Sequence, residues 1–207
     1  MKRKADKALS GYEVLLGVTG GIACYKSADL VSKLVQAGAG VTVAMTESAE
    51  RFVAPLTFQT LCLRPVYRNL WQATEEYESG HISLTERADI FIVAPATANI
   101  LAKMAAGIAD DLVSCLALSA SGECPILVAP AMNARMWSAP PTQANVRRLR
   151  SWGVQVVGPG EGFLACRAFG AGRMAEPGEI ITAASKILLR RRPKGARGEG
   201  SRRDTPR

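Results

Sequence analysis

The chain alternates short, unbroken apolar runs with segments of helical periodicity, and this alternation constrains its fold more than any other feature. The runs over 14–18, 41–45, 89–94, 125–129 and 154–157 have the length and composition of buried strands. Helical patterns are predicted over 22–36, 48–54, 81–87, 98–106, 111–121, 142–152 and 178–189. Strands that are apolar throughout and alternate with helices predict an α/β fold, a doubly wound parallel sheet in a three-layer α/β/α single domain.

Three segments fall outside this pattern. Residues 55–61 favour neither helix nor strand, residues 64–80 are predicted to be a loop, and residues 158–172 are predicted to be a glycine-rich loop. We see no second domain and no internal repeat. The expected division is a basic N-terminal extension over 1–11, the folded domain over 12–189, and a tail over 190–207.

The net charge of +8 lies at the two ends of the chain. Residues 190–207 hold seven Arg and one Lys against two acids, and residues 1–10 hold four basic residues against one acid. The ends therefore carry +6 and +3, which leaves −1 for residues 11–189. The tail lacks large apolar residues, so it is predicted to be disordered. A weak contact of this tail with RNA or a membrane surface stays open, but neither a specific nucleic acid nor a membrane is an expected partner.

The cysteines and the lack of targeting signals indicate a cytoplasmic location. The five cysteines form no CxxC pair, so disulfides and a zinc site are not expected. Cys115 and Cys124 lie in apolar runs typical of a core, whereas Cys166 lies in the glycine-rich loop. No apolar stretch reaches the ~20 residues that span a bilayer, and the basic N-terminus does not resemble a signal peptide.

Small, hydroxylated or amide residues follow every predicted strand. In an open α/β sheet a ligand binds beyond the carboxyl ends of the strands, and glycines and hydroxyls there suit a phosphate. The first loop is neither GxGxxG nor GxxxxGK[ST], so the usual NAD and ATP motifs are missing. The set therefore indicates a mononucleotide such as FMN. Its members include Thr19, Gly20, Gly21, Thr46, Ser48, Thr97, Ala98 and Asn99.

Two further residues have side chains suited to chemistry. Asn133 stands between Met132 and Met136 after the fourth predicted strand, and a carboxamide can orient a carboxylate or carbonyl. The same run also fits a simple proline-initiated turn with a hydrophobic plug. His81 is the only histidine and can exchange a proton near neutral pH, although a lone histidine is often structural. No Cys/His/Asp cluster indicates a metal site, and no GxSxG motif indicates a hydrolase.

Four motifs in order give the chain a resemblance to the flavin-containing cysteine decarboxylases, and among them to the phosphopantothenoylcysteine decarboxylases. Residues 95–99 match the PA[S/T]AN flavin loop, and residues 130–137 match the PAMNxxMW substrate motif. Residues 80–84 match the histidine motif, and residues 164–170 with 172–177 match the substrate flap. Order and spacing agree over roughly residues 12–188.

The resemblance implies a flavodoxin-like fold that binds FMN and assembles as a homotrimer or a multiple of it, such as a dodecamer, with the site between neighbouring subunits. The implied reaction converts 4'-phosphopantothenoyl-L-cysteine into 4'-phosphopantetheine for coenzyme A synthesis. In this reaction the cysteine moiety is transiently oxidised to a thioaldehyde, which makes carbon dioxide a good leaving group.

The resemblance also implies roles for single residues. His81 would act as the acid/base or orient the carboxylate, Asn133 would bind that carboxylate, and Cys166 would supply a proton. Met136 and Ala165 would shape the substrate site, and Ala131 would approach the flavin through its backbone. The remaining residues implied to hold FMN are Gly20, Gly21, Thr46, Ser48, Thr97, Ala98 and Asn99.

Two departures from the family pattern stand out. Arg167 replaces the glycine that usually follows the flap cysteine. The change is costly if the backbone there needs a positive φ; the alternative is that the arginine serves as a cation near the substrate phosphate. Ile100 replaces a threonine at the end of the flavin loop. Two alternatives remain: a peptidyl-cysteine decarboxylase of the lantibiotic type, and a non-catalytic regulatory flavoprotein. A flavin prenyltransferase is not expected to carry PAMNxxMW.

Overall fold

A computed structural model describes residues 7–70, 80–163, 165, 167 and 169–197, with only the backbone given for 80, 81, 196 and 197. Its main feature is a six-stranded parallel sheet with the strand order β3-β2-β1-β4-β5-β6. The strands are β1 (Glu13–Val18), β2 (Gly40–Met45), β3 (Val66–Tyr67), β4 (Ile90–Ala96), β5 (Ile126–Pro130) and β6 (Gln155–Val156). The doubly wound parallel sheet predicted from the apolar runs is confirmed.

The edge strand β3 was not predicted. It has only two residues, Val66 and Tyr67, and Val66 is in register with Val43 of β2. A two-residue strand has no apolar run that a pattern could reveal. Without it, the other five strands follow the order 2-1-3-4-5 of flavodoxin-like folds, whose topological switch point here lies between β1 and β4.

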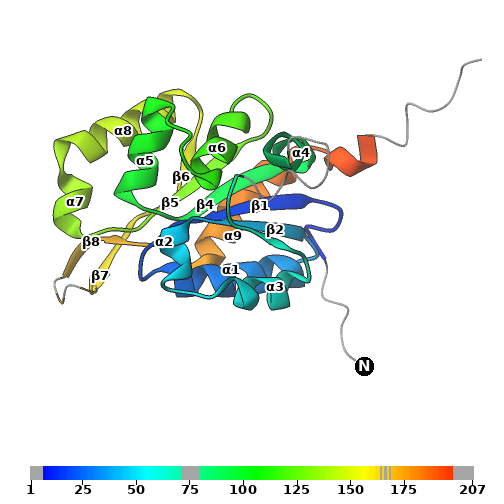
Figure 1. Ribbon diagram of the computed structural model, residues 1–207, viewed down its shortest axis with the longest axis horizontal. Helices are drawn as coiled ribbons and strands as arrows, with labels where there is room; N and C mark the ends of the chain where they lie inside the picture. Colours follow the sequence, from blue (N-terminus) through cyan, green and yellow to red (C-terminus); the bar gives the residue numbers. More distant parts are fainter. Residues whose placement is uncertain (1–6, 71–79, 164, 166, 168, 198–207) are drawn as a thin grey trace, which may run out of the picture.

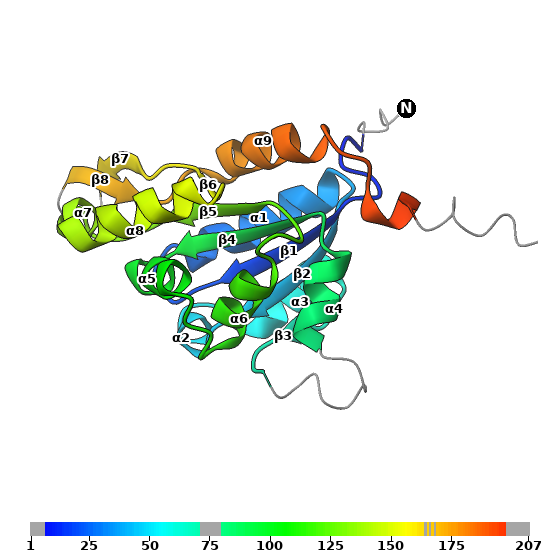
Figure 2. The ribbon, with the colours of Figure 1, turned by 90° about the horizontal axis from the view of Figure 1, so that it is seen from above.

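Helices cover both faces of the sheet (Figures 1 and 2). One face packs against α1 (Cys24–Gln36), α3 (Pro55–Cys62) and α9 (Pro177–Leu188). The other face packs against α4 (Gly80–Arg87), α5 (Ala98–Ala106), α6 (Leu112–Ser119) and α8 (Pro140–Ser151). Two short helices, α2 (Glu47–Glu50) and α7 (Ala134–Ser138), follow the carboxyl ends of β2 and β5.

The strands are apolar throughout because both faces are buried. Along β1, Leu16 packs into the core beneath α1, whereas its neighbour Leu15 packs into the core beneath α5 and α6. Along β4, Ile92 and Phe91 divide between the same two cores, and all four side chains are at most 1% exposed. Successive side chains of a strand point to opposite faces, so a sheet covered twice needs apolar residues at every position.

The segment predicted as a glycine-rich loop forms a hairpin instead. Strands β7 (Gly160–Phe163) and β8 (Phe169–Arg173) pair antiparallel, with Phe163 in register with Phe169. Glycine is depleted in strands, so the composition argued against this pairing. In Figures 1 and 2 the hairpin lies beside α7, beyond the carboxyl ends of β4 and β5.

Parts of both predicted extensions pack on the domain. Leu9 is 1% exposed within the core, although it falls in the expected N-terminal extension. The described part of the predicted disordered tail, residues 190–197, instead contacts the fold: Tyr12 Oη donates to the Arg191 carbonyl at 2.7 Å, and the Lys194 amide donates to Asp89 at 2.7 Å. Residues 198–207 lie outside the described residues. Within the described ranges, the helices are all too short or too polar to cross a membrane.

Candidate functional site

A cavity of about 1150 Å³ lies at the carboxyl edge of the sheet, around the switch point between β1 and β4. Its volume exceeds the roughly 300–1,000 Å³ of ordinary small-molecule sites, so it has room for a nucleotide and a second ligand. The cavity is lined by the loops after β1, β2, β4 and β5 and by the hairpin. This is the position that the loop analysis predicted.

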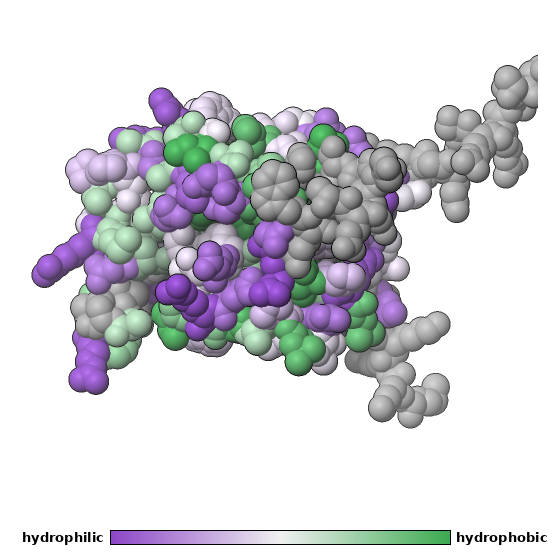
Figure 3. Space-filling view, in the orientation of Figure 1, coloured by the Kyte–Doolittle hydropathy of each residue, from purple (hydrophilic) through white to green (hydrophobic). Residues whose placement is uncertain are grey.

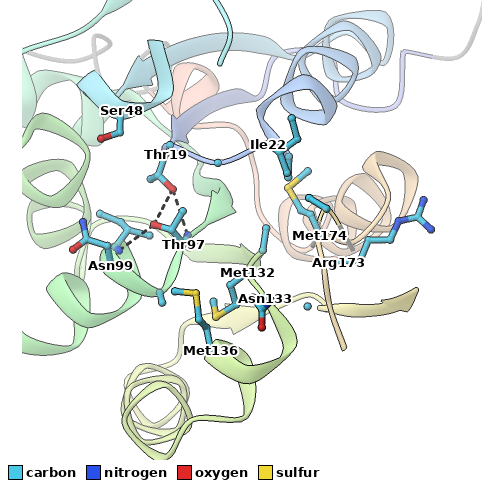
Figure 4. A pocket seen from close by; sticks show the side chains of 18 of the residues that line it. Thr19, Ile22, Ser48, Thr97, Asn99, Met132, Asn133, Met136, Arg173 and Met174 are labelled. Atoms are coloured by element: carbon cyan, nitrogen blue, oxygen red, sulfur yellow. Dashed lines mark hydrogen bonds between the residues drawn. The ribbon is translucent and has the colours of Figure 1, made fainter. Parts of the chain in front are cut away.

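The loops after β1 and β4 are joined by a buried hydroxyl. Thr19 Oγ1 donates to the carbonyl oxygen of Pro95 at 2.7 Å. It also accepts from the Thr97 amide at 3.3 Å (Figure 4). Thr97 in turn is the N-cap of α5, because its Oγ1 accepts from the Ile100 amide at 3.4 Å. One hydroxyl therefore fixes two cavity loops relative to each other.

The loops after β1 and β2 approach each other so closely that only glycine fits. A Cβ on Gly20 would lie 2.4 Å from the Ser48 Cβ and 2.7 Å from the Ser48 carbonyl carbon. Thr46 caps α2 by accepting from the Ala49 amide at 3.3 Å. Residues 20–23 at the start of the 13-residue helix α1 also line the cavity. Backbone amides and a positive helix end at this point favour a bound anion such as phosphate.

The loop after β5 presents the Asn133 carboxamide. Asn133 is half-buried and caps α7, because its Oδ1 accepts from the Arg135 amide at 2.8 Å. The Met132 amide donates to the Gly172 carbonyl at 2.9 Å, which ties this loop to the hairpin. Figure 4 shows Met132, Asn133 and Met136 on one side of the cavity, across from Ile22 and Met174.

The hairpin completes the wall with Phe163, Ala165, Arg167 and Arg173. Arg167 has a φ of +61°, in the left-handed region that suits glycine. The sequence analysis warned that arginine is costly at a position needing a positive φ, and the structure places Arg167 in that conformation. The cost for a residue other than glycine, asparagine or aspartate is about 1–2 kcal/mol.

Ion pairs occupy two corners of the cavity. Lys103 Nζ lies 2.6 Å from both Asp110 and Asp111. Burial alone would lower the pKa of Lys103, but the hydrogen bonds to these two carboxylates outweigh it and raise the pKa, while the bond from Lys103 lowers the pKa of Asp110. At the other corner, Lys26 Nζ lies 2.9 Å from Glu176 Oε1 and lowers the pKa of that carboxyl group.

Besides Thr19, eleven residues to which the resemblance gave a role line this one cavity. They are Gly20, Gly21, Thr46, Ser48, Thr97, Ala98, Asn99, Ala131, Asn133, Met136 and Ala165. Cys166 lies outside the described residues. The backbone of His81 begins α4, but its side chain is likewise not described. The described side chains of α4, residues 82–87, do not line the cavity.

Sequence reasoning missed several lining residues. Ile22, Tyr25 and Phe163 reach the cavity although nothing in their pattern marks a ligand site. Lys103 and Asp111 lie on predicted helices. Only the pairing of a Lys with carboxylates seven and eight residues further on could have drawn attention to them. Among the described residues no cluster of His, Cys, Asp or Glu could hold a metal ion.

Fold and site together define a nucleotide-binding protein of the doubly wound, flavodoxin-like class. The Flavoprotein family model matches residues 2–189, and the chain belongs to that family. The structure thus supports the fold that the resemblance implied.

Curated relatives carry the matching region as less than half of their length. The coenzyme A biosynthesis bifunctional protein CoaBC of Bacillus subtilis (strain 168) is 47% identical over 178 residues, which is 86% of this chain and 43% of that protein. The protein of the same name from Escherichia coli (strain K12) is 45% identical over 174 residues, 84% of this chain and 42% of that protein.

Solved structures match over nearly their whole length. A PPC decarboxylase mutant complexed with pantothenoylaminoethenethiol has a TM-score of 0.77 and 28% identity, over 87% of this chain and 99% of that one. The FMN-dependent cysteine decarboxylase SpaF has a TM-score of 0.75 and 30% identity, over 86% of this chain and 96% of that one. The FMN-binding protein AtHal3 has a TM-score of 0.76 and 29% identity, over 88% of this chain and 99% of that one.

Proposed function

We propose that this chain catalyses the FMN-dependent decarboxylation of 4'-phosphopantothenoyl-L-cysteine to 4'-phosphopantetheine in coenzyme A synthesis. The observation that carries the proposal is the single cavity in which the flavin loop over 95–99, the substrate loop around Asn133 and the hairpin meet. The bifunctional coenzyme A relatives and the PPC decarboxylase neighbour support the same reaction. Since coenzyme A synthesis is the relatives' named process, we place the enzyme in the cytoplasm.

The residues at the sheet edge fit FMN. The absence of a side chain at Gly20 lets the loops after β1 and β2 come close together at the cavity, and glycine-containing loops of this kind suit a phosphate. Hydroxyls of Thr46, Ser48 and Thr97 and the Asn99 amide supply further polar groups, and Ala98 and Ala131 leave space for a flat ring. When bound, FMN supplies the two-electron redox chemistry that makes the cysteine moiety a thioaldehyde and later reverses the oxidation.

The protein's own part in the reaction is to orient the substrate and move protons. Since the Oδ1 of Asn133 is held by the Arg135 amide, the NH₂ group is the end that donates to the substrate carboxylate. Met136 and Ala165 bound the apolar part of the substrate site. Cys166 supplies a proton to the enethiol formed after carbon dioxide has left, and His81 serves as the acid/base or orients the carboxylate.

We further propose a homotrimer, or a multiple of it, with each site completed by a neighbouring subunit. Helix α4 packs against α6, and its described side chains do not line the cavity, so His81 would act in the neighbour's site. Apolar side chains at the cavity rim support such a contact, because Ile22 and Tyr25 are each 61% exposed. Further exposed apolar side chains lie on α3 or next to it in the chain, at Phe52, Leu56 and Leu63. Figure 3 shows hydrophobic surface along the lower edge of this face.

The test is flavin binding together with turnover in two variants. The purified protein should show the absorption band of oxidised flavin near ~450 nm, and His81→Asn and Cys166→Ser should each abolish turnover while keeping that band. Full product formation by either variant would remove the role assigned to that residue. A protein that turns over a C-terminal cysteine peptide but not phosphopantothenoylcysteine would instead support the peptide decarboxylase alternative, and a yellow protein that turns over neither would support the regulatory one.

A further inference from the structure

Arg167 holds a backbone conformation that its side chain does not favour, at the wall of the cavity. Among the described residues other than glycine, only Leu63 and Arg167 have a positive φ. Leu63 is the C-cap of α3, a position where a left-handed residue ends the helix. Arg167 ends no helix, and glycine would adopt its conformation without cost. Strain that persists beside a ligand cavity points to a function for the side chain that causes it.

The charges around the cavity set Arg167 apart from the other cations. Lys26 and Arg173 both contact Glu176, at 2.9 and 2.6 Å. Lys103 contacts Asp110 and Asp111, both at 2.6 Å. Arg167 has no carboxylate partner within the described part of the chain and is exposed. Among the cations that line the cavity, Arg167 is therefore the one that forms no ion pair with a described residue.

We propose that Arg167 binds the phosphate monoester of the substrate and makes the site selective for the phosphorylated form. The proposal rests on the proposed function. A guanidinium matches a phosphate group in charge and geometry and donates two parallel hydrogen bonds to it. The phosphate of FMN would be held by Gly20, Gly21 and Ser48, which belong to the sheet edge and not to the hairpin.

The experiment compares the substrate with its dephosphorylated analogue, pantothenoylcysteine, in the FMN-loaded protein. Arg167→Gly suits the backbone and removes the cation, Arg167→Lys keeps a cation, and Arg150→Gln on α8 is the control for loss of an exposed arginine. Arg167→Gly should raise KM for the phosphorylated substrate about tenfold and leave that for pantothenoylcysteine within about twofold. Arg167→Lys should recover most of the difference, and Arg150→Gln should change neither value.

Three outcomes would overturn the proposal. Equal changes in KM for both substrates would mean that Arg167 does not recognise the phosphate. Weaker binding of FMN, but not of riboflavin, to Arg167→Gly would assign the cation to the cofactor. If the wild-type protein turns over neither substrate, the proposed function fails, and calorimetry with 4'-phosphopantothenate then tests Arg167 directly. Equal affinity of wild type and Arg167→Gly for that ligand would contradict the inference.

Discussion

Thr19 Oγ1 donates a hydrogen bond of 2.7 Å to the carbonyl oxygen of Pro95, across the switch point of the sheet. Thr19 is 2% exposed, so the bond is shielded from water. The two residues belong to the loops after β1 and β4, and both loops line the cavity. The relative position of the loops that would hold FMN thus depends on one buried hydroxyl.

Replacing this hydroxyl should weaken both the fold and flavin binding. Thr19→Val keeps the shape but leaves the Pro95 carbonyl without its donor, which we expect to cost about 1–3 kcal/mol of the free energy of unfolding. Urea denaturation of the apoprotein and FMN titration measure the two effects. Thr60→Val, which removes an exposed hydroxyl bonded to Leu56, should change stability by about 0.5 kcal/mol or less. Equal losses in the two variants would show that the buried bond has no special role.

The glycine at position 20 should be irreplaceable for steric reasons. In Gly20→Ala the new methyl group would lie 2.4 Å from the Ser48 Cβ, so the loops after β1 and β2 must separate. We expect FMN affinity to fall at least about tenfold, because the amides lose their place beside the phosphate. Gly178→Ala is the matched control, since a Cβ there meets nothing within 4 Å. An unchanged FMN affinity in Gly20→Ala would mean that the loop contact does not shape the site.

The buried Lys26 should stabilise the connection between α1 and the segment after the hairpin. Its Nζ donates to the Met174 carbonyl at 3.1 Å and to Glu176 at 2.9 Å, and its side chain is 7% exposed. Lys26→Met should lose about 1–3 kcal/mol, whereas Lys33→Met, which breaks an exposed pair with Asp29, should lose about 0.5 kcal/mol or less. Chemical denaturation of both variants decides between a structural bond and an incidental contact.

The same pair gives a pH dependence with a definite sign. The hydrogen bond from Lys26 lowers the pKa of Glu176 below its ordinary value of 4.5. A carboxyl group whose pKa is lower in the folded than in the unfolded protein stabilises the fold at pH values above its pKa in the unfolded protein. That contribution disappears as the pH falls through its pKa in the folded protein. Wild type should therefore lose its advantage over Glu176→Gln below about pH 4.5. Glu176 is half exposed, so the advantage should be about 1 kcal/mol or less. A constant difference from pH 7 to pH 3 would contradict the assignment.

Mixing inactive variants tests whether neighbouring subunits share a site. If His81 serves the neighbour's cavity, a mixed oligomer of His81→Asn and Cys166→Ser subunits contains some sites with both native residues. Random assembly of equal amounts should restore about one quarter of the wild-type activity. Each variant alone is the control and should stay inactive. No recovery after refolding the variants together would place His81 and Cys166 in the same subunit's site.

The layers of the fold could be predicted because the apolar runs are long and both faces are buried. Residues such as Leu15 and Leu16 are equally apolar, which only a doubly covered sheet explains. The loops at the carboxyl edge could be identified once the strands were predicted, because ligands bind beyond the carboxyl ends of the strands in such sheets. The hairpin and β3 could not be predicted, because Gly160–Phe163 is rich in glycine and Val66–Tyr67 is too short for any periodicity.

The charge network of the cavity was also beyond sequence reasoning. Lys26 and Glu176 are 150 residues apart, so nothing local indicates that they pair. Arg167 could be recognised as unusual from its position in the flap motif, but its positive φ and its place among ion-paired cations needed the structure. The contacts of the tail could not be foreseen, because the Arg191 carbonyl, the Lys194 amide and the Lys194 Nζ bond to residues about 100 or more positions away, which composition does not reveal.

The most direct test is the product that the purified, FMN-loaded protein forms from 4'-phosphopantothenoyl-L-cysteine. We expect release of carbon dioxide and a product with the mass of 4'-phosphopantetheine, with the flavin oxidised at the start and at the end. Unchanged substrate in the presence of bound FMN, or a protein that binds no FMN at all, would contradict the account.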